Sequence, residues 1–581
     1  MNHPSSALWW LILLLSFAAC KPEEASQTSN TLTVRIKGSV EGFNPVTSNK
    51  LSYIQKWIFP SLVNFDPESE KLAPVLIDSL PEKVTIDTGI YAGAPAYRFR
   101  FLDAAKWPNG SDITAKDYIF SLKVALNKGI KDNSLIRTYS PIIRDVLPAP
   151  KDNKSFIVVL QKEIINVTAY LGGFALLPAY HYDPKHLLDS FVLSDFVKDF
   201  EQLKKKHPAI LEFAKDFNSE KYIRAPKEIV GAGPYRLARW DANEQLILVK
   251  KENFWADKLP QKSVYITGNP DTLIYKIVPD EVATSLMLKN EQLDLVADMR
   301  EEQFVKLKSN PTIAEKYNFF TPSSPGYYLI LLNNRSPKLT KPVRKALAQC
   351  ISLDQINQVA TAGLGTKVVG LLSPNSPYYD HDLKPIKQDI AQAKKRLQEE
   401  GWTDSDHDGI LDKTIHGKKT PLILKLLSAN STGVGQVVSP VIKEAAAKIG
   451  IKIVIQGASL KQIIGGLRSH DYDMALVRFV TSPADYMPYG SWHSDNAGKN
   501  GRNFTGYSSS RTDSVITALQ EAHTTAKKKE LYRQFQENIY EDQPVIFLFS
   551  PTKTLVVHKR WEPVVSSVRP GYFEGGFRLK K

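Results

Sequence analysis

A glycine-rich turn that opens a hairpin constrains this chain more than any other stretch. The turn is residues 231–234 (Gly-Ala-Gly-Pro), and the hairpin follows over residues 235–250. Two glycines permit positive φ, and Pro234 fixes the exit of the turn. On either side of a second turn at residues 241–243, apolar and polar residues alternate, which predicts two strands. We therefore expect a tight turn that feeds a β-hairpin.

The same turn is not the phosphate-binding loop of a dinucleotide-binding domain. That loop needs the pattern G-x-G-x-x-G followed by a helix. Here the third glycine is missing, Pro234 stands inside the turn, and the following residues predict a strand. A nucleotide-binding interpretation is therefore excluded.

The turn and hairpin resemble a phrase of one known family. The phrase is G-[TA]-GPY-x-[LV], then a hairpin, then N-x-x-[YF]W, which corresponds here to residues 253–255. It is typical of extracytoplasmic solute-binding proteins of the peptide/nickel class (family 5), the capture subunits of ABC importers. Other stretches resemble further phrases of the family and occur in its order: residues 31–75, 105–121, 176–181, 327–351 and 531–548.

The resemblance implies an α/β protein with the type II periplasmic-binding-protein (Venus-flytrap-like) fold. Two lobes would be joined by a hinge, with an extra inserted domain, and the ligand would bind in the cleft between the lobes. The implied divisions are a signal peptide at 1–20, a flexible tether at 21–30, lobe I from 31–75, 229–325 and 546–581, inserted domain II at 76–228, and lobe II (domain III) at 326–545.

Local patterns predict several elements. Residues 31–36 alternate and predict the first strand. Thr114 is placed to cap a helix, with Asp117 as its capping-box partner three residues on. A second helix begins near Thr340, and its apolar stripe includes Cys350, which we therefore expect to be a buried thiol.

Composition excludes some partners. The 581 residues are too many for a single core, so two or three domains are expected. The formal charge of +14 is spread over the chain without a long run of Lys and Arg, so we expect no nucleic-acid partner. Such a surface is compatible with anionic membranes or acidic ligands.

The N-terminus predicts export. Residues 7–19 form an apolar run of signal-peptide length, too short to cross a bilayer as a helix. The run ends in Phe17-Ala18-Ala19-Cys20, which resembles a lipobox, so Cys20 is the expected site of lipidation. Residues 1–6 lack Lys and Arg, and Phe17 replaces the usual Leu, so an ordinary signal peptide is the alternative. Lipidation would leave Cys350 without a partner, and no disulfide is expected.

An aspartate-rich loop offers a possible metal site. Asp404, Asp406, Asp408 and the following Gly409 have the ligand spacing of a calcium loop. An EF-hand would need a bidentate Glu at the twelfth position, which is Ile415. Two interpretations stay open: a structural calcium site, or a polar turn without metal. No other cofactor is expected.

The function implied by the resemblance is peptide capture for import. The partners would be a peptide, ABC permease subunits with cytoplasmic ATPases, and the membrane through the lipid, and we expect a monomer. No G-x-S-x-G, Walker A, H-E-x-x-H or Cys/His zinc spacing is present, so we expect no enzyme. The alternatives are a non-peptide solute (nickel complex, haem, sugar or opine), a sensor without transport, or, remotely, a hydrolase.

Peptide-binding members place an Asp near the end of a strand, just after an aromatic residue, to pair with the α-amine of the peptide. The corresponding stretch here is residues 472–486, where the next acid after the strand is Asp485. Asp485 either caps a turn or helix, or takes the amine, since a buried ammonium needs a carboxylate. In the second case, five further residues would line the pocket: Arg478, Phe479, Tyr489, Trp492 and Tyr507.

Overall fold

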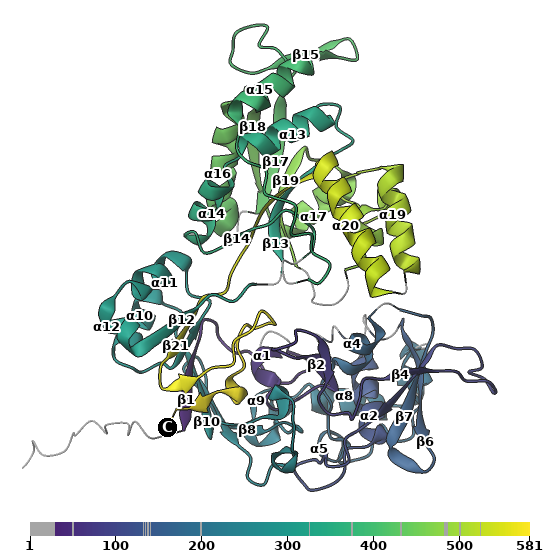
Figure 1. Ribbon diagram of the computed structural model, residues 1–581. Helices are drawn as coiled ribbons and strands as arrows, with labels where there is room; N and C mark the ends of the chain where they lie inside the picture. The colour runs from purple at the N-terminus through teal and green to yellow at the C-terminus, as the bar shows by residue number, and fades with distance from the viewer. Residues whose placement is uncertain are drawn as a thin grey trace, which may run out of the picture.

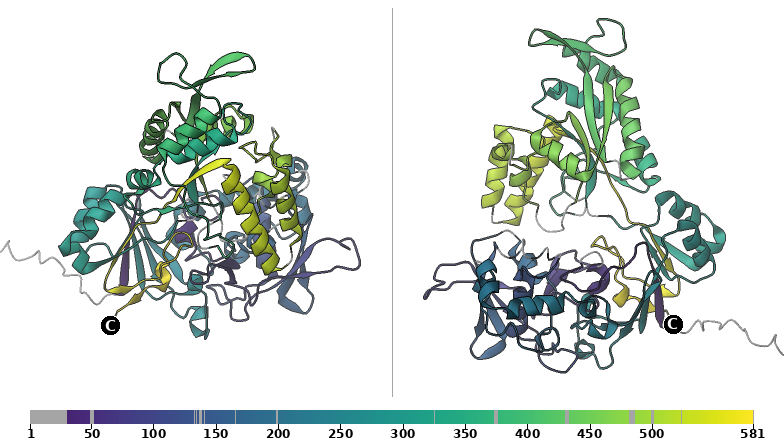
Figure 2. Two further views of the ribbon diagram at one scale, coloured as in Figure 1. Left: turned by 45° about the horizontal axis from the view of Figure 1, so that its top comes forward. Right: turned by 180° about the vertical axis from the view of Figure 1, so that it is seen from behind.

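The structure is a computed structural model, shown in Figure 1. It describes residues 30–48, 52–131, 133, 135, 139, 141–164, 166–197, 200–324, 326–372, 376–429, 433–480, 486–498, 501–522 and 524–580. Two bodies face each other: lobe II lies at the top of Figure 1, and lobe I with the inserted domain lies below it. The view from behind in Figure 2 shows the same separation.

Lobe I is built on a seven-stranded sheet of order β12-β21-β11-β1-β10-β9-β8. The expected first strand is confirmed as β1 (Thr31–Ile36), and its alternate residues Leu32, Val34 and Ile36 are buried. It runs parallel to β10 and β11 in the centre of the sheet. The other strands are β8 (Tyr235–Asp241), β9 (Gln245–Lys250), β10 (Thr272–Ile277), β11 (Leu295–Ala297), β12 (Tyr317–Phe320) and β21 (Leu555–His558).

The predicted hairpin is confirmed as the antiparallel pair β8 and β9. The reason given for its two glycines is wrong, because neither Gly231 nor Gly233 has positive φ. A Cβ on Gly233 would lie 2.3 Å from the carbonyl oxygen of Trp57, and one on Gly231 would lie 2.2 Å from that of Ile58. The glycines therefore allow two segments of backbone to touch. Lys251 closes the turn by donating from Nζ to the Gly231 carbonyl oxygen at 2.6 Å.

The inserted domain contains a four-stranded sheet of order β4-β5-β7-β6 and is packed beside lobe I. Its helix α2 (Ala115–Leu126) begins with the predicted capping box between Thr114 and Asp117. One apolar cluster runs from the lobe I strands through this domain, so the two parts share a core. The remaining elements of this region are α1 (Ser52–Gln55), β2 (Val63–Phe65), β3 (Leu72–Pro74), β4 (Glu82–Val84), β5 (Ala96–Arg100), β6 (Ile143–Ala149), β7 (Asp152–Leu160), α4 (Val167–Gly172), α5 (Ala179–Tyr182), α6 (Leu193–Val197), α7 (Phe200–Lys206), α8 (Ala209–Phe217) and α9 (Glu220–Arg224).

Lobe II is built on a six-stranded sheet of order β14-β20-β13-β19-β17-β18. Alternate residues of β13 (Tyr327–Leu332) enter different cores: Ile330 and Leu332 pack with α13 to α16, while Leu329 and Leu331 pack with α17 to α20. The sheet is therefore covered on both faces. Its elements are α13 (Lys341–Cys350), α14 (Leu353–Thr361), β14 (Thr366–Lys367), α15 (Ile390–Glu399), β17 (Ile423–Ala429), α16 (Gly433–Ala447), β18 (Lys452–Ala458), α17 (Leu460–Ser469), β19 (Met474–Phe479), α18 (Tyr489–Trp492), α19 (Ser510–Glu521), α20 (Thr525–Asp542) and β20 (Val545–Ser550).

Smaller elements complete the fold. A hairpin of β15 (Asp412–Ile415) and β16 (Lys418–Pro421) projects from lobe II, away from lobe I. Three short helices, α10 (Glu281–Lys289), α11 (Glu301–Lys308) and α12 (Pro311–Lys316), cover one side of the lobe I sheet beside the hinge. Strands β22 (Trp561–Glu562) and β23 (Arg578–Leu579) pair near the C-terminus.

The chain crosses between the lobes twice. The first crossing, with described residues 321–324 and 326, leads from β12 to β13, and the second, residues 551–554, joins β20 to β21. The expected boundary at residue 546 needs correction, because β20 pairs with β13 and β14 in the sheet of lobe II. Every residue of β20 is buried, so its apolar pattern fits either lobe, and only the pairing assigns it. We place the return to lobe I at the second crossing.

Cys350 is fully buried in lobe II, as its helical stripe predicts. Burial raises the pKa of its thiol to about 12, so it is unreactive at neutral pH. Within the described ranges, no helix combines the length and apolar character needed to cross a membrane.

Candidate functional site

The two crossings form a short two-stranded ribbon between the lobes. Ser324 donates its amide to the carbonyl oxygen of Pro551 at 2.9 Å, and Lys553 donates its amide to that of Pro322 at 2.8 Å. Each crossing therefore satisfies backbone groups of the other, and together they act as one hinge element. Because the strands of lobe II that adjoin this ribbon are β13, β19 and β20, their hinge-side ends face lobe I (Figure 1).

Two of the predicted site residues lie at that hinge-side end. Arg478 is exposed near the end of β19, and its Nη2 donates to the hydroxyl of Ser324 at 2.9 Å. Its guanidinium carbon lies 5.9 Å from the centre of the Tyr328 ring. The Phe479 ring is stacked on Tyr327, with centroids 6.3 Å apart and planes 4° apart. A cation and aromatic surface are thus brought together beside the hinge.

Two other predicted residues, Trp492 and Tyr507, lie inside lobe II. Trp492 is 1% exposed, and its Nε1 donates to the hydroxyl of Tyr486 at 2.8 Å. Tyr507 is 4% exposed, and its hydroxyl donates to Asp542 at 2.7 Å. Both side chains are packed inside lobe II with their polar atoms satisfied, so their assignment as pocket lining is corrected to a supporting position.

Tyr489 is half-buried at the start of α18, and its hydroxyl donates to Asp495 at 3.1 Å. Its ring packs on that of His493, with centroids 4.6 Å apart, and within the described part of the chain no contact joins it to the hinge residues. Asp485 and Cys20 lie outside the described residues, so both remain predictions from the sequence.

On the lobe I side of the hinge, Asp298 is held in an uncommon conformation. Its φ is +56°, its amide donates to the Thr554 carbonyl oxygen at 3.0 Å, and its carboxylate accepts from Lys553 Nζ at 2.8 Å. Positive φ at a residue other than glycine persists where the surroundings impose it. The hydroxyl of Thr554 also donates to the Met299 carbonyl oxygen at 2.7 Å. The segment after β11 is thereby fixed to the second crossing.

Two buried titratable groups, Lys56 and Glu574, lie in the aromatic core of lobe I. Lys56 Nζ lies 4.8, 5.5 and 4.4 Å from the ring centres of Trp57, Tyr265 and Phe573. Burial lowers the pKa of Lys56 to about 8, and Glu574 opposes this shift. Burial raises the pKa of the Glu574 carboxyl, whose Oε1 accepts from the hydroxyl of Tyr275 at 3.1 Å. The sequence offers no signal for this pair, since its members come from opposite ends of the chain.

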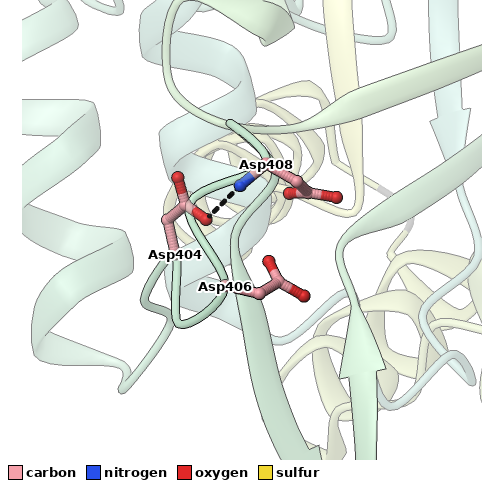
Figure 3. Close-up of side chains that lie close together, drawn as sticks. All are labelled: Asp404, Asp406 and Asp408. Carbon is pink, nitrogen blue, oxygen red and sulfur yellow. Dashed lines mark hydrogen bonds between the residues drawn. The ribbon is translucent and has the colours of Figure 1, made fainter.

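The aspartate-rich loop lies between α15 and β15, remote from the hinge (Figure 1). Figure 3 shows its three carboxylates gathered around one point, with one ligand oxygen from each within 4.8 Å of the others. Asp404 accepts backbone amides from Asp408 and Gly409, each at 3.1 Å, and Asp406 accepts from Lys419 Nζ at 2.7 Å. These contacts stabilise the loop as a turn, and they leave the calcium prediction open.

The comparisons with known proteins agree with this architecture. Residues 90–501 match the model of "Bacterial extracellular solute-binding proteins, family 5 Middle", and the chain belongs to that family. The recognised family and its type II periplasmic-binding-protein fold are thus confirmed. Members of the family are solute-binding proteins, which agrees with the expectation that the chain is no enzyme.

Several relatives cover nearly the whole chain. The oligopeptide-binding protein AppA of Bacillus subtilis is 23% identical over 573 residues, which is 95% of this chain and 94% of that protein. The structure of AppA from Bacillus subtilis in complex with a nonapeptide gives a TM-score of 0.62 at 22% identity, over 95% of this chain and 99% of that one. NikA from Brucella suis in complex with Fe(III)-EDTA gives 0.68 at 16% identity, over 95% and 100%.

Proposed function

We propose that this protein captures peptides of oligopeptide length between its lobes and delivers them to an ABC permease. The observation that carries the proposal is a two-lobe fold with a double crossing, shared along 95% of the chain with an oligopeptide-binding protein. Peptide-binding sites of this kind hold the ligand backbone mainly by main-chain hydrogen bonds, so they discriminate length and termini more than side chains.

We place the ligand against the hinge-side end of lobe II. Arg478 and Phe479 form one wall of the proposed ligand site. Trp492 and Tyr507 are buried behind it and support it, and Tyr489 lies farther from the hinge than Arg478 and Phe479 do. Asp485 is the proposed anchor of the peptide amine, on the grounds of its position after the strand that ends at Phe479.

The proposed setting is extracytoplasmic. A lipid on Cys20 would hold the mature chain at a membrane through the tether of residues 21–30, and the protein would act as a monomer. The partners would be permease subunits with their cytoplasmic ATPases.

The test is native mass spectrometry of the purified protein, followed by calorimetric titration with synthetic peptides of two to nine residues. We expect a co-purified peptide that is released unchanged on unfolding, and micromolar or tighter binding of the longer peptides. A co-purified metal chelate, sugar or haem, together with no peptide binding, would assign the same fold to another solute. Cleavage of the peptides would instead indicate a hydrolase.

A further inference from the structure

Glu301 is an acidic residue of lobe I that none of the proposed ligand contacts uses. It is the first residue of α11 and is half-buried. Within the described part of the chain its carboxylate makes no ion pair, whereas the nearby Lys37 pairs with Glu281 at 3.0 Å. Burial raises the pKa of the Glu301 carboxyl. An approaching cation stabilises the ionised form of such a partly buried carboxylate.

The cation placed to do so is Arg478 of lobe II. Glu301 follows the segment that is fixed to the second crossing through Thr554. Arg478 is fixed to the first crossing through Ser324. Since the two crossings are hydrogen-bonded to each other, the acid and the guanidinium lie on opposite sides of one hinge.

Tyr328, the second residue of β13, has its ring centre 5.9 Å from the guanidinium carbon of Arg478. Burial raises the pKa of its hydroxyl, Arg478 lowers that pKa, and Glu301 raises it. One side chain beside the hinge therefore experiences the charges of both lobes. In the present arrangement Arg478 donates to Ser324, and no ion pair joins it to Glu301 among the described residues.

We propose that Arg478 and Glu301 form an ion pair across the hinge when the lobes close, and that this pair holds the closed conformation. Rotation about the ribbon brings the end of β19 toward the start of α11, while Ser324 guides the guanidinium in the open arrangement. Closure also removes water from the pair, which strengthens its electrostatic attraction. Glu301 would then act as a positioning residue that sets affinity through the stability of closure, and Arg478 would have this role in addition to its place in the proposed ligand wall.

The inference rests on the proposed capture function only in that a ligand drives closure. The first test measures binding of a free-amine nonapeptide by parent, Glu301→Gln, Arg478→Gln and the double variant. We expect Glu301→Gln to weaken binding about tenfold, Arg478→Gln to weaken it at least as much, and the double variant to bind no more weakly than Arg478→Gln, because the ion pair is already lost in that single variant. The matched control is Glu302→Gln, since Glu302 is the exposed neighbour on the same helix. It should bind as the parent does.

A charge exchange separates this role from a merely structural one. The variant carrying both Glu301→Arg and Arg478→Glu should recover most of the lost affinity and the ligand-induced decrease in radius of gyration seen by X-ray scattering. Weaker binding in Arg478→Gln with unchanged binding in Glu301→Gln would mean that Arg478 acts on the ligand alone and not through Glu301, and it would overturn the pair. Additive losses without recovery in the exchanged variant would overturn it too.

Disulfide trapping tests the pair without knowledge of the ligand. Cysteines at positions 301 and 478 can join only when their Cα atoms approach to about 7 Å or less. We expect mild oxidation to cross-link this pair and to produce a compact molecule, while cysteines at 302 and 478 remain reduced. If the parent binds no peptide but the cross-link forms, the peptide proposal fails and the proposed approach of Arg478 to Glu301 on closure stands. If no cross-link forms, the proposed ion pair between Arg478 and Glu301 is wrong, whatever the ligand is.

Discussion

The amide of Gly233 donates to the carbonyl oxygen of Ile58 at 2.9 Å. This bond joins the turn that opens β8 to the segment after α1, two parts of lobe I separated in sequence by the whole inserted domain. The amide of Tyr235 adds a second bond, to the carbonyl oxygen of Trp57 at 3.1 Å. The return of the chain to lobe I is thus fixed by direct backbone contact.

This contact predicts a large effect for one methyl group. In Gly233→Ala the Cβ would lie 2.3 Å from the Trp57 carbonyl oxygen, so the backbones must separate. We expect a loss of about 3 kcal/mol in the free energy of unfolding of lobe I, measured by urea denaturation. The control is Gly38→Ala, whose Cβ meets no atom within 4 Å. Equal stability of the two variants would contradict the proposed role of the glycine.

Lys251 predicts a dependence of stability on pH. Burial lowers the pKa of its amine from 10.5 to about 7 in the folded protein. Between these values the unfolded chain binds a proton that the folded protein does not, so stability rises with pH by up to about 1.4 kcal/mol per pH unit. Relative to Lys251→Met, the parent should gain about 2 kcal/mol between pH 7 and pH 9 in urea titrations.

The neighbouring Lys250 provides the control for this measurement. Its Nζ lies 3.7 Å from the Asp257 carboxylate, and Lys250→Met should retain the rise in stability with pH that the buried Lys251 causes. Parallel pH curves for the parent and Lys251→Met would mean that the amine stays protonated in the folded state.

If the loop of Figure 3 binds calcium, the ion should stabilise lobe II. After treatment with a chelator, added calcium should raise the melting temperature, with a gain of about 1.4 kcal/mol at ten times the dissociation constant. Asp406→Asn should abolish the gain. Lys419→Gln should enlarge the gain, because Lys419 Nζ now donates to the Asp406 carboxylate at 2.7 Å and competes with a metal ion for it. If added calcium does not change the melting temperature of the parent, the loop is a polar turn without metal.

Asp485 predicts how the ligand terminus is recognised. If its carboxylate pairs with the peptide amine, Asp485→Asn should weaken binding of a free-amine peptide by more than about tenfold, since an unpaired buried ammonium is costly. An N-acetylated peptide of the same sequence should bind both proteins almost equally in calorimetry. Equal losses for the two peptides would assign the residue to capping a turn or helix.

Cys20 predicts the attachment of the protein to a membrane. Each buried CH₂ of an acyl chain contributes about 0.8 kcal/mol, so two or three chains hold firmly. Cys20→Ser should move the protein from the membrane fraction to the soluble extracytoplasmic fraction, with loss of the lipid mass in mass spectrometry. Full retention of the variant with membranes would contradict lipidation.

Sequence patterns predicted those features whose causes are local. The alternation of β1 and the capping box of Thr114 each depend on residues a few positions apart, and both are confirmed. The glycines of the turn were recognised for the wrong reason, because their partners Trp57 and Ile58 are remote in sequence.

The candidate site was predicted only in part for the same reason. Arg478 and Phe479 lie at a strand end beside the hinge, and their contact with a ligand stays a prediction. Trp492 and Tyr507 resemble ligand-lining aromatics in composition, and only the packing of α18 to α20 assigns them to a core. Glu574 has no sequence signal at all, since its partner Lys56 is near the other end of the chain.

The double crossing also determines the order in which the molecule can be completed. Strand β21 lies between β12 and β11 in the sheet of lobe I, yet it follows all of lobe II in the chain. A chain emerging N-terminus first can finish the inserted domain and lobe II while a gap persists in the first sheet. Lobe I is sealed by a strand that is made only after all of lobe II, so a chain truncated before β21 is left with an open, unpaired sheet rather than a smaller working protein.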